Sequence, residues 1–99
     1  MKTAAVLVVF FLGFASCNIP LYEPYFQVAE RYYSDGDYTR AIGMYIKAIG
    51  ENDKQAETYY GLAMAYYRRG DLEEAMLAFE KTISLDPKNE SAYERLASV

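Results

Sequence analysis

The sequence predicts an all-α protein made of antiparallel helical hairpins that stack into a short solenoid. Residues 22–55 and 56–89 are identical at eleven of 34 aligned positions, where chance would give roughly two. Within each copy the apolar side chains recur at the spacing of one helix face. No proline and no strand-like alternation interrupts residues 25–86. A fixed period of this length is typical of repeat architectures, so we expect two full copies followed by a partial third helix.

Residues 1–16 differ from the rest of the chain and are expected to be a signal peptide. Lys2 gives a basic start, and residues 4–15 carry no charged or polar side chain. The run is too short for a transmembrane helix, which needs about 20 apolar residues. A basic start, a short apolar run and small residues after it match a secretory signal. The alternative is a buried N-terminal helix, although its apolar pattern would differ from that of the other helices.

The apolar run ends in Phe14-Ala15-Ser16-Cys17, which resembles the lipobox of bacterial lipoproteins. The resemblance implies that Cys17, the chain's one cysteine, carries the lipid and begins a lipid-anchored tether over residues 17–21. Phe14 departs from the usual Leu of the family. Asn18 is not the Asp that retains some lipoproteins at the inner membrane, which favours the outer membrane, facing the periplasm. The alternative is a secreted or soluble periplasmic chain.

The first copy, residues 22–55, is expected to form two helices around a Gly36-Asp37 turn. Glycine suits a left-handed conformation at a helix end, and Asp37 can accept from the first free N–H groups of the second helix. Asn52 and Asp53 would make the exit turn. The apolar positions of the two helices are Tyr25, Val28, Ala29, Tyr32, then Tyr38, Ala41, Tyr45 and Ile49.

The second copy, residues 56–89, repeats this plan around Gly70 and Asp71. Glu74 lies three residues after Asp71, which predicts a capping box with Asp in the Ser/Thr role. Pro87 ends the second helix, because the residue before a proline is pushed out of the α region. The apolar positions are Tyr59, Leu62, Ala63, Tyr66, then Leu72, Ala75, Phe79 and Ile83.

This pattern resembles the tetratricopeptide repeat (TPR), whose motif has an aromatic residue, Leu, a small residue and Tyr, followed by Ala, Phe and Pro. The second copy carries Tyr59, Leu62, Ala63, Tyr66, Ala75, Phe79 and Pro87 at the motif's spacing. The small residues would let the helices approach closely. We expect Tyr25, Tyr32, Tyr59 and Tyr66 in the core.

Residues 90–99 begin a third copy with Tyr93, Leu96 and Ala97 in register. We expect this partial repeat to form a short capping helix that covers the helix around residues 72–85. The alternative is that the chain is a truncated fragment of a longer exported TPR protein.

TPR arrays present a concave face lined by the first helix of each pair. Aromatic residues and Met are enriched at the centres of protein interfaces, and such a groove would take an extended segment or an amphipathic helix. Tyr33 and Tyr67 could instead pack against the following helix. Phe26, Tyr60 and Met64 could be covered by the tether or by another copy. The resemblance implies these partner-binding candidates: Phe26, Glu30, Tyr33, Tyr60, Met64, Tyr67 and Arg68.

Composition excludes several functions. The chain has no His, one Cys and a net charge of −4, which argues against His-based catalysis, a cysteine zinc site and a nucleic-acid surface. Acidic residues near helix starts are explained by the helix dipole. We therefore expect no enzyme, no metal and no cofactor. A TPR subclass grips a partner's C-terminal carboxylate with Lys and Asn; their absence here argues against a cytosolic chaperone-docking role.

These observations predict an envelope-anchored TPR lipoprotein that acts as a protein–protein interaction module or assembly factor. Its partners would be a protein or peptide in the groove and a membrane through lipidated Cys17. The alternative function is a self-associating structural scaffold, in which another copy covers the open end of the array.

Overall fold

A computed structural model describes residues 24–99; the expected signal peptide, Cys17 and the tether lie outside the described residues. Residues 24–99 form five α-helices and no strand: α2 (Tyr25–Ser34), α3 (Tyr38–Glu51), α4 (Ala56–Arg69), α5 (Leu72–Leu85) and α6 (Glu90–Ser98). The all-α fold class is confirmed. None of these five helices has both the length and the apolar character that a membrane crossing requires.

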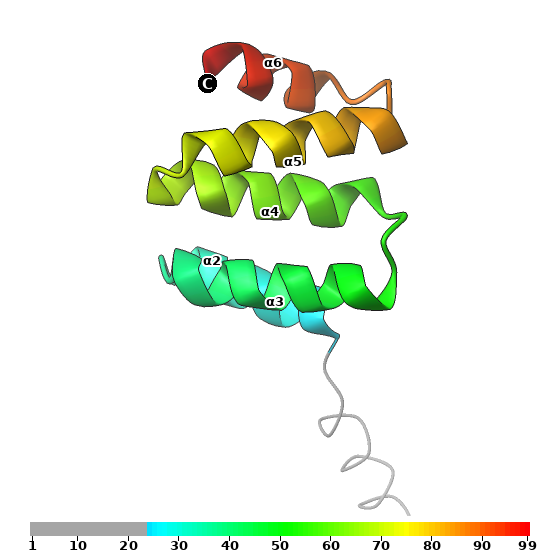
Figure 1. Cartoon of the computed structure of the whole chain (residues 1–99). Coiled ribbons are helices and arrows are strands. Elements are labelled where there is room, and N and C mark those ends of the chain that lie inside the picture. The colour runs from blue at the N-terminus through cyan, green and yellow to red at the C-terminus, as the bar shows by residue number, and fades with distance from the viewer. Residues whose placement is uncertain (1–23) are drawn as a thin grey trace, which may run out of the picture.

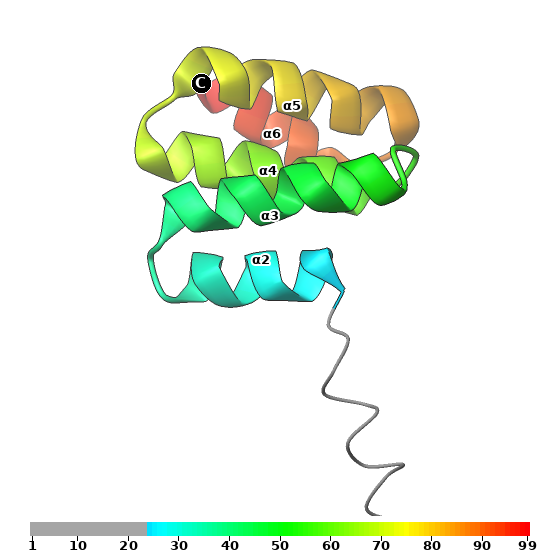
Figure 2. The same cartoon turned by 60° about the horizontal axis from the view of Figure 1, so that its bottom comes forward.

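The helices stack as two hairpins and a final helix. Each helix packs antiparallel against the next, and α2 also touches α4 across the hairpin boundary. Figure 1 shows α4, α5 and α6 in successive layers, with α3 and α2 at the other end of the stack. Figure 2 shows the α2–α3 hairpin from its side, with α2 on the outer face. The contact between α2 and α4 brings together the first helices of the two repeats.

Glycine makes the turn inside each hairpin, as the sequence predicted. Gly36 has φ 81° and Gly70 has φ 97°, a left-handed conformation that side chains with a Cβ adopt at a cost. This glycine conformation turns the chain back toward the end of the helix. The N–H of Asp37 then donates to Tyr32 O, and the N–H of Asp71 donates to Tyr66 O, each at 2.9 Å. These bonds satisfy carbonyls that the helix end would otherwise leave free.

The helix starts differ between the hairpins. Asp37 accepts from the N–H of Arg40 at 3.1 Å, and Asn89 accepts from the N–H of Ala92 at 3.0 Å. The expected capping box at Asp71 is wrong, because its side chain caps no N–H. Its carboxylate instead accepts from Arg69 Nε at 2.6 Å. A charge-assisted bond to a nearby guanidinium is strong enough to compete with a cap.

The two exit turns are alike although only the second contains proline. Asn52 Oδ1 accepts from the N–H of Lys54 at 3.0 Å, and Asp86 Oδ1 accepts from the N–H of Lys88 at 3.3 Å. Such bonds two residues ahead are typical of Asx turns. The amide or carboxylate after each helix therefore makes the same turn in both repeats.

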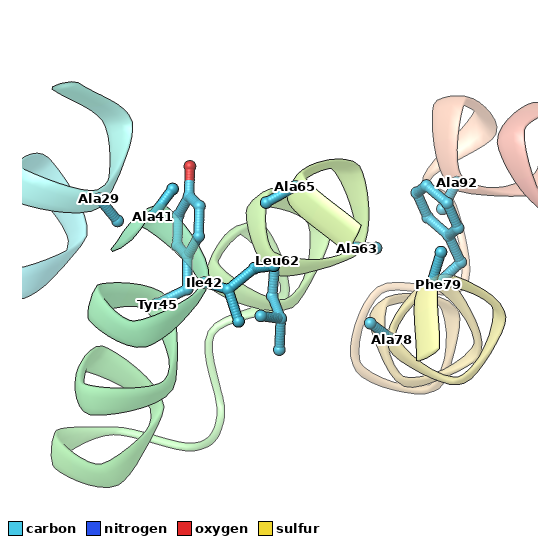
Figure 3. Packing of buried hydrophobic residues seen from close by; sticks show 11 residues of the cluster. Ala29, Ala41, Ile42, Tyr45, Leu62, Ala63, Ala65, Ala78, Phe79 and Ala92 are labelled. Atoms are coloured by element: carbon cyan, nitrogen blue, oxygen red, sulfur yellow. The ribbon is translucent and has the colours of Figure 1, made fainter. Parts of the chain in front are cut away.

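Alanines and two aromatic rings form the centre of the core (Figure 3). The four alanines expected at the close helix contacts are fully buried: Ala29, Ala41, Ala63 and Ala75. Phe79 is 0% exposed and Tyr45 is 3% exposed. Leu72, expected on the apolar face, is 46% exposed. The helices thus meet through small residues, and large rings fill the space beside them.

Four tyrosines expected in the core are only half-buried: Tyr25, Tyr32, Tyr59 and Tyr66. Lys47 Nζ lies 5.7 Å from the centre of the Tyr25 ring, and Lys81 Nζ lies 5.8 Å from that of Tyr59. Cations attract the faces of aromatic rings. All four rings meet a basic side chain, and Tyr32 and Tyr66 also pack against the core.

The last helix covers α5 with Leu96, as expected, and with Ala92 instead of Tyr93 and Ala97. Ala92 is fully buried and Leu96 packs against the core, whereas Tyr93 is 49% exposed. Ala97 is also exposed. Ala92 stands 34 positions after Thr58, which is 1% exposed at the start of α4. A small buried residue at this position lets the start of a first helix approach the preceding second helix.

Candidate functional site

A groove with a volume of about 400 Å³ lies between α2 and α4, with α3 beneath it. Its position follows from the contact between the first helices of the two repeats. The side chains that line it come from three helices: Glu30, Tyr33 and Ser34 from α2, Tyr45 from α3, and Tyr60, Gly61 and Met64 from α4.

Four of the seven partner-binding candidates line this groove: Glu30, Tyr33, Tyr60 and Met64. The other three lie elsewhere. Phe26 packs against the core, with its ring on Tyr45. Tyr67 also packs against the core, and Arg68 is exposed outside the groove lining.

Sequence reasoning missed three lining residues: Ser34, Tyr45 and Gly61. Tyr45 was assigned to the core alone, whereas it is both a core residue and the floor of the groove. Gly61 carried only a weak signal. Glycine inside a helix is unfavourable by about 1 kcal/mol relative to alanine, but Gly43 and Gly50 also lie inside a helix and have no neighbour within 4 Å of a Cβ. Glycine in the sequence therefore does not locate the close contact.

The floor of the groove is a close contact between Tyr45 and Gly61. A Cβ on Gly61 would lie 2.5 Å from two carbons of the Tyr45 ring and 2.7 Å from its hydroxyl oxygen. On its other side the ring meets Phe26 edge to face, with centroids 5.9 Å apart and an angle of 66°. Figure 3 shows this ring rising from α3 with its hydroxyl at the far end. Gly61 therefore makes room for the ring under the groove.

The two tyrosines of the walls are also held by neighbouring rings. Tyr33 meets Tyr38 of α3 at 5.3 Å between centroids, and Tyr60 meets Phe79 of α5 at 5.8 Å. Both contacts are edge to face, the arrangement that aromatic quadrupoles favour. All three groove tyrosines are thus fixed by a ring from another helix.

The groove carries one formal charge among its lining residues, the carboxylate of Glu30. Burial, together with the nearby charges of Glu30 and Tyr33, raises the pKa of the Tyr45 hydroxyl to about 12. The hydroxyl therefore stays neutral well above the pH at which an exposed tyrosine ionises.

A second hollow, of about 270 Å³, lies between α4 and α5 on the other side of the second hairpin. None of the predicted candidates lines it; its residues are Tyr59, Leu62, Tyr66, Glu74, Leu77, Ala78 and Lys81. Within residues 24–99, no group of three His, Cys, Asp or Glu side chains is placed to hold a metal ion.

Comparison with known proteins supports the helical-repeat fold. One similar solved structure is the first TPR domain of Spaghetti (RPAP3) bound to the HSP90 peptide SRMEEVD, with a TM-score of 0.73 and 23% identity. The match covers 75% of this chain and 59% of that chain, and at this identity it supports the fold alone. The curated proteins gave no match. Residues 28–90 match the family model of the tetratricopeptide repeat, and the chain therefore belongs to the tetratricopeptide repeat family.

Proposed function

We propose that the protein is a lipid-anchored interaction module of the bacterial cell envelope, which binds a segment of a partner protein in the groove between α2 and α4. The observation that carries the proposal is the gathering of Glu30, Tyr33, Tyr60 and Met64 around one hollow. Family membership supports a role in protein–protein interaction. The groove lies on the face formed by the first helices, where TPR arrays offer a binding surface.

The groove suits a protruding part of a partner rather than a large flat surface. Its volume of about 400 Å³ is near the lower end of the roughly 300–1,000 Å³ that ligand pockets occupy. Its tyrosines are held by other rings, so binding would order few additional side chains, and this lowers the entropic cost of association. A short extended segment or one face of a helix fits these properties.

The similar Spaghetti domain is bound to an HSP90 peptide that ends in acidic residues. The groove of this chain has no Lys, Arg or Asn among its lining residues. We therefore propose that the groove binds a peptide segment, as in that structure, but not an acidic one.

Cross-linking in cells tests the groove. A photoreactive residue placed at Ser34 would lie in the groove, and one at Glu80, which is exposed on α5 and lines neither hollow, serves as the control. We expect a discrete adduct from position 34 that is absent from position 80. Tyr60→Ser together with Met64→Ser should abolish it. An adduct that survives both substitutions, or no adduct, would contradict the assigned groove.

The proposed anchor rests on the apolar run of residues 4–15 and on the single cysteine that follows it. Lipid chains contribute about 0.8 kcal/mol per buried CH₂, and stable attachment needs more than one chain. Mass spectrometry of the native N-terminus should find lipid-modified Cys17, and Cys17→Ala should leave an uncleaved or unlipidated chain. An unmodified N-terminus at Ser16 or Asn18 would reject the anchor.

A second candidate function is self-association as a scaffold. Large apolar side chains remain exposed on the last two helices, including Leu77 at 67% and Tyr93 at 49%. A second copy could cover them. Sedimentation of the purified protein in detergent, compared with Tyr93→Ser, tests this: a monomer at all concentrations excludes the scaffold.

A further inference from the structure

We propose that the groove selects a basic side chain, lysine or arginine, which sits among the rings of Tyr33, Tyr45 and Tyr60 with the Glu30 carboxylate as its counter-ion. This inference rests on the proposed function, because it names the chemistry of the segment that the groove binds. Its basis is the combination, in one hollow, of three held aromatic rings and one negative charge.

The first step is the aromatic lining. A cation within about 6 Å of a ring centre is attracted by the ring face, and the attraction is stronger when the site is desolvated. The groove tyrosines come from three helices, so a cation seated in the hollow is approached by rings from α2, α3 and α4. Their edge-to-face contacts outside the groove keep the rings in place before a partner arrives.

The second step is that four tyrosines outside the groove already meet the protein's own cations. Lys47, Lys81, Arg40 and Arg69 lie 5.7–6.0 Å from the rings of Tyr25, Tyr59, Tyr32 and Tyr66. Among residues 24–99, none of these cation–ring contacts involves a groove tyrosine. The groove therefore has rings of the same chemistry with room for a cation from outside the chain.

The third step is charge. Glu30 is the one charged side chain of the lining. Burial is the main cause of the raised pKa of Tyr45, and the Glu30 carboxylate adds to it. The same carboxylate attracts a positive charge that enters the groove. At the equivalent position of the second repeat the chain carries Met64. The carboxylate is thus a property of this groove and not of the repeat scaffold.

The other classes of ligand fit less well. An acidic segment would bring a carboxylate against Glu30, and like charges repel. A purely apolar segment would desolvate Glu30 without giving it a partner, which is costly for a charged group. A lysine or arginine satisfies both the carboxylate and the rings, because its aliphatic stem also packs against apolar surface.

Short peptides that differ in one side chain test the inference on the full-length protein in detergent. The probes are acetyl-Ala-Xaa-Ala-amide peptides in which Xaa is arginine, lysine, citrulline, norleucine or glutamate. Citrulline has nearly the shape of arginine without its charge. Binding is followed by NMR through the amide signals of Gly61 and Met64. We expect arginine and lysine to bind about tenfold more tightly than citrulline and norleucine, and glutamate to bind most weakly.

Glu30→Gln should remove most of this preference, leaving the affinities for arginine and citrulline within about threefold of each other. Glu80→Gln is the matched control, because it makes the same charge change on an exposed position of α5 outside the groove. Tyr60→Leu should weaken the arginine peptide more than the norleucine peptide. Equal affinity for arginine and citrulline, or signal changes away from the groove, would overturn the inference.

The cross-link from Ser34 separates this inference from the proposed function. If the Ser34 adduct forms and needs Tyr60 and Met64 while the peptides show no charge preference, the interaction groove stands and the basic-side-chain inference fails. If the adduct does not depend on the groove, the proposed function fails, and the inference that rests on it fails with it.

Discussion

The two hairpins contain the same aromatic contact with the hydroxyl on opposite partners. In the first, Phe26 of α2 meets Tyr45 of α3 at 5.9 Å and 66°. In the second, Tyr60 of α4 meets Phe79 of α5 at 5.8 Å and 64°. The paired residues are 34 positions apart. The repeat therefore determines where rings pack, while the exchange of Phe and Tyr determines where a polar group lies.

This exchange places a hydroxyl at the floor of the groove between α2 and α4. Tyr45 brings a hydroxyl to the groove floor, whereas Phe79, at 0% exposed, brings none. The helix that follows also differs: Gly61 lies against the Tyr45 ring, and the equivalent position of the third copy carries Arg95. The two repeats thus differ at two equivalent pairs of positions. Tyr45 and Gly61 form the floor of the groove, whereas Phe79 is a buried ring without a hydroxyl.

The hairpin turns show the reverse case, in which different positions give the same arrangement. Arg40 lies 6.0 Å from the ring of Tyr32 and pairs with Asp37; Arg69 lies 5.9 Å from the ring of Tyr66 and pairs with Asp71. The tyrosines and aspartates are equivalent between repeats, but Arg40 follows the turn and Arg69 precedes it. The stabilising arrangement of ring, cation and carboxylate has therefore been built twice from different residues.

The largest expected difference between the two ring contacts is a pH dependence of the free energy of unfolding, which Tyr45 causes and Phe79 cannot. The pKa of Tyr45 is raised from 10.0 to about 12, so above pH 10 the unfolded chain loses this proton first. The raised pKa therefore contributes about 2–3 kcal/mol to the free energy of unfolding. This contribution is present below pH 10 and is lost as the pH rises through 12. Urea unfolding at pH 9 and pH 12 should show this loss in the wild type relative to Tyr45→Phe. An equal loss in both would show that Tyr45 ionises normally.

Exchanging the hydroxyls between the hairpins should give the next largest effect. Phe79→Tyr adds a hydroxyl to a fully buried ring, and an unpaired buried hydroxyl costs about 1–3 kcal/mol. Tyr45→Phe at neutral pH should change the free energy of unfolding by less than about 1 kcal/mol. Chemical denaturation of the two variants measures the contrast. Equal costs would mean that the two ring contacts have equivalent surroundings.

Glycine substitutions test the close contact at the groove floor. Gly61→Ala places a Cβ against the Tyr45 ring and should destabilise the protein by about 1–3 kcal/mol through overpacking. Gly43→Ala, in α3, is the matched control, because a Cβ there would have no neighbour within 4 Å. That substitution should stabilise the helix by about 0.5–1 kcal/mol. If both variants are stabilised, the ring yields without cost and the groove floor is adaptable.

The parts of the fold that follow a local code could be predicted from the sequence. Helical periodicity, the glycine turns and the small residues at helix contacts depend on neighbours a few residues away, and Gly36, Gly70, Ala29 and Ala63 behave as expected. Four groove residues were also identified, because the repeat register locates the face of the first helices. The register gives position along a helix, but not how deep a side chain lies.

What the sequence did not predict depends on contacts between elements. Tyr45 has the pattern of a core residue, and only the approach of α4 through Gly61 makes it a groove residue as well. Tyr25 and Tyr59 also carry core spacing, but basic side chains from the second helix of each hairpin meet them at the surface. Similarly, Ala92 rather than Tyr93 faces α5 because a small residue allows the closer packing.

The smallest effect concerns the two turn aspartates, which are equivalent by sequence and different in structure. Asp37 caps α3 through the N–H of Arg40, and replacing an N-cap by Ala costs about 1 kcal/mol. Asp71 makes no cap and pairs with a partly exposed Arg69, a kind of ion pair worth about 0.2–1 kcal/mol. Asp37→Ala should therefore destabilise more than Asp71→Ala, because it removes an N-cap as well as an exposed ion pair with Arg40. The difference should persist in high salt, because salt screens both exposed ion pairs more than the hydrogen-bonded cap. Thermal unfolding at low and high salt measures both variants. Equal and equally salt-sensitive losses would mean that both aspartates act through charge alone. The two hairpins would then differ in their aromatic contacts but not in their turn aspartates.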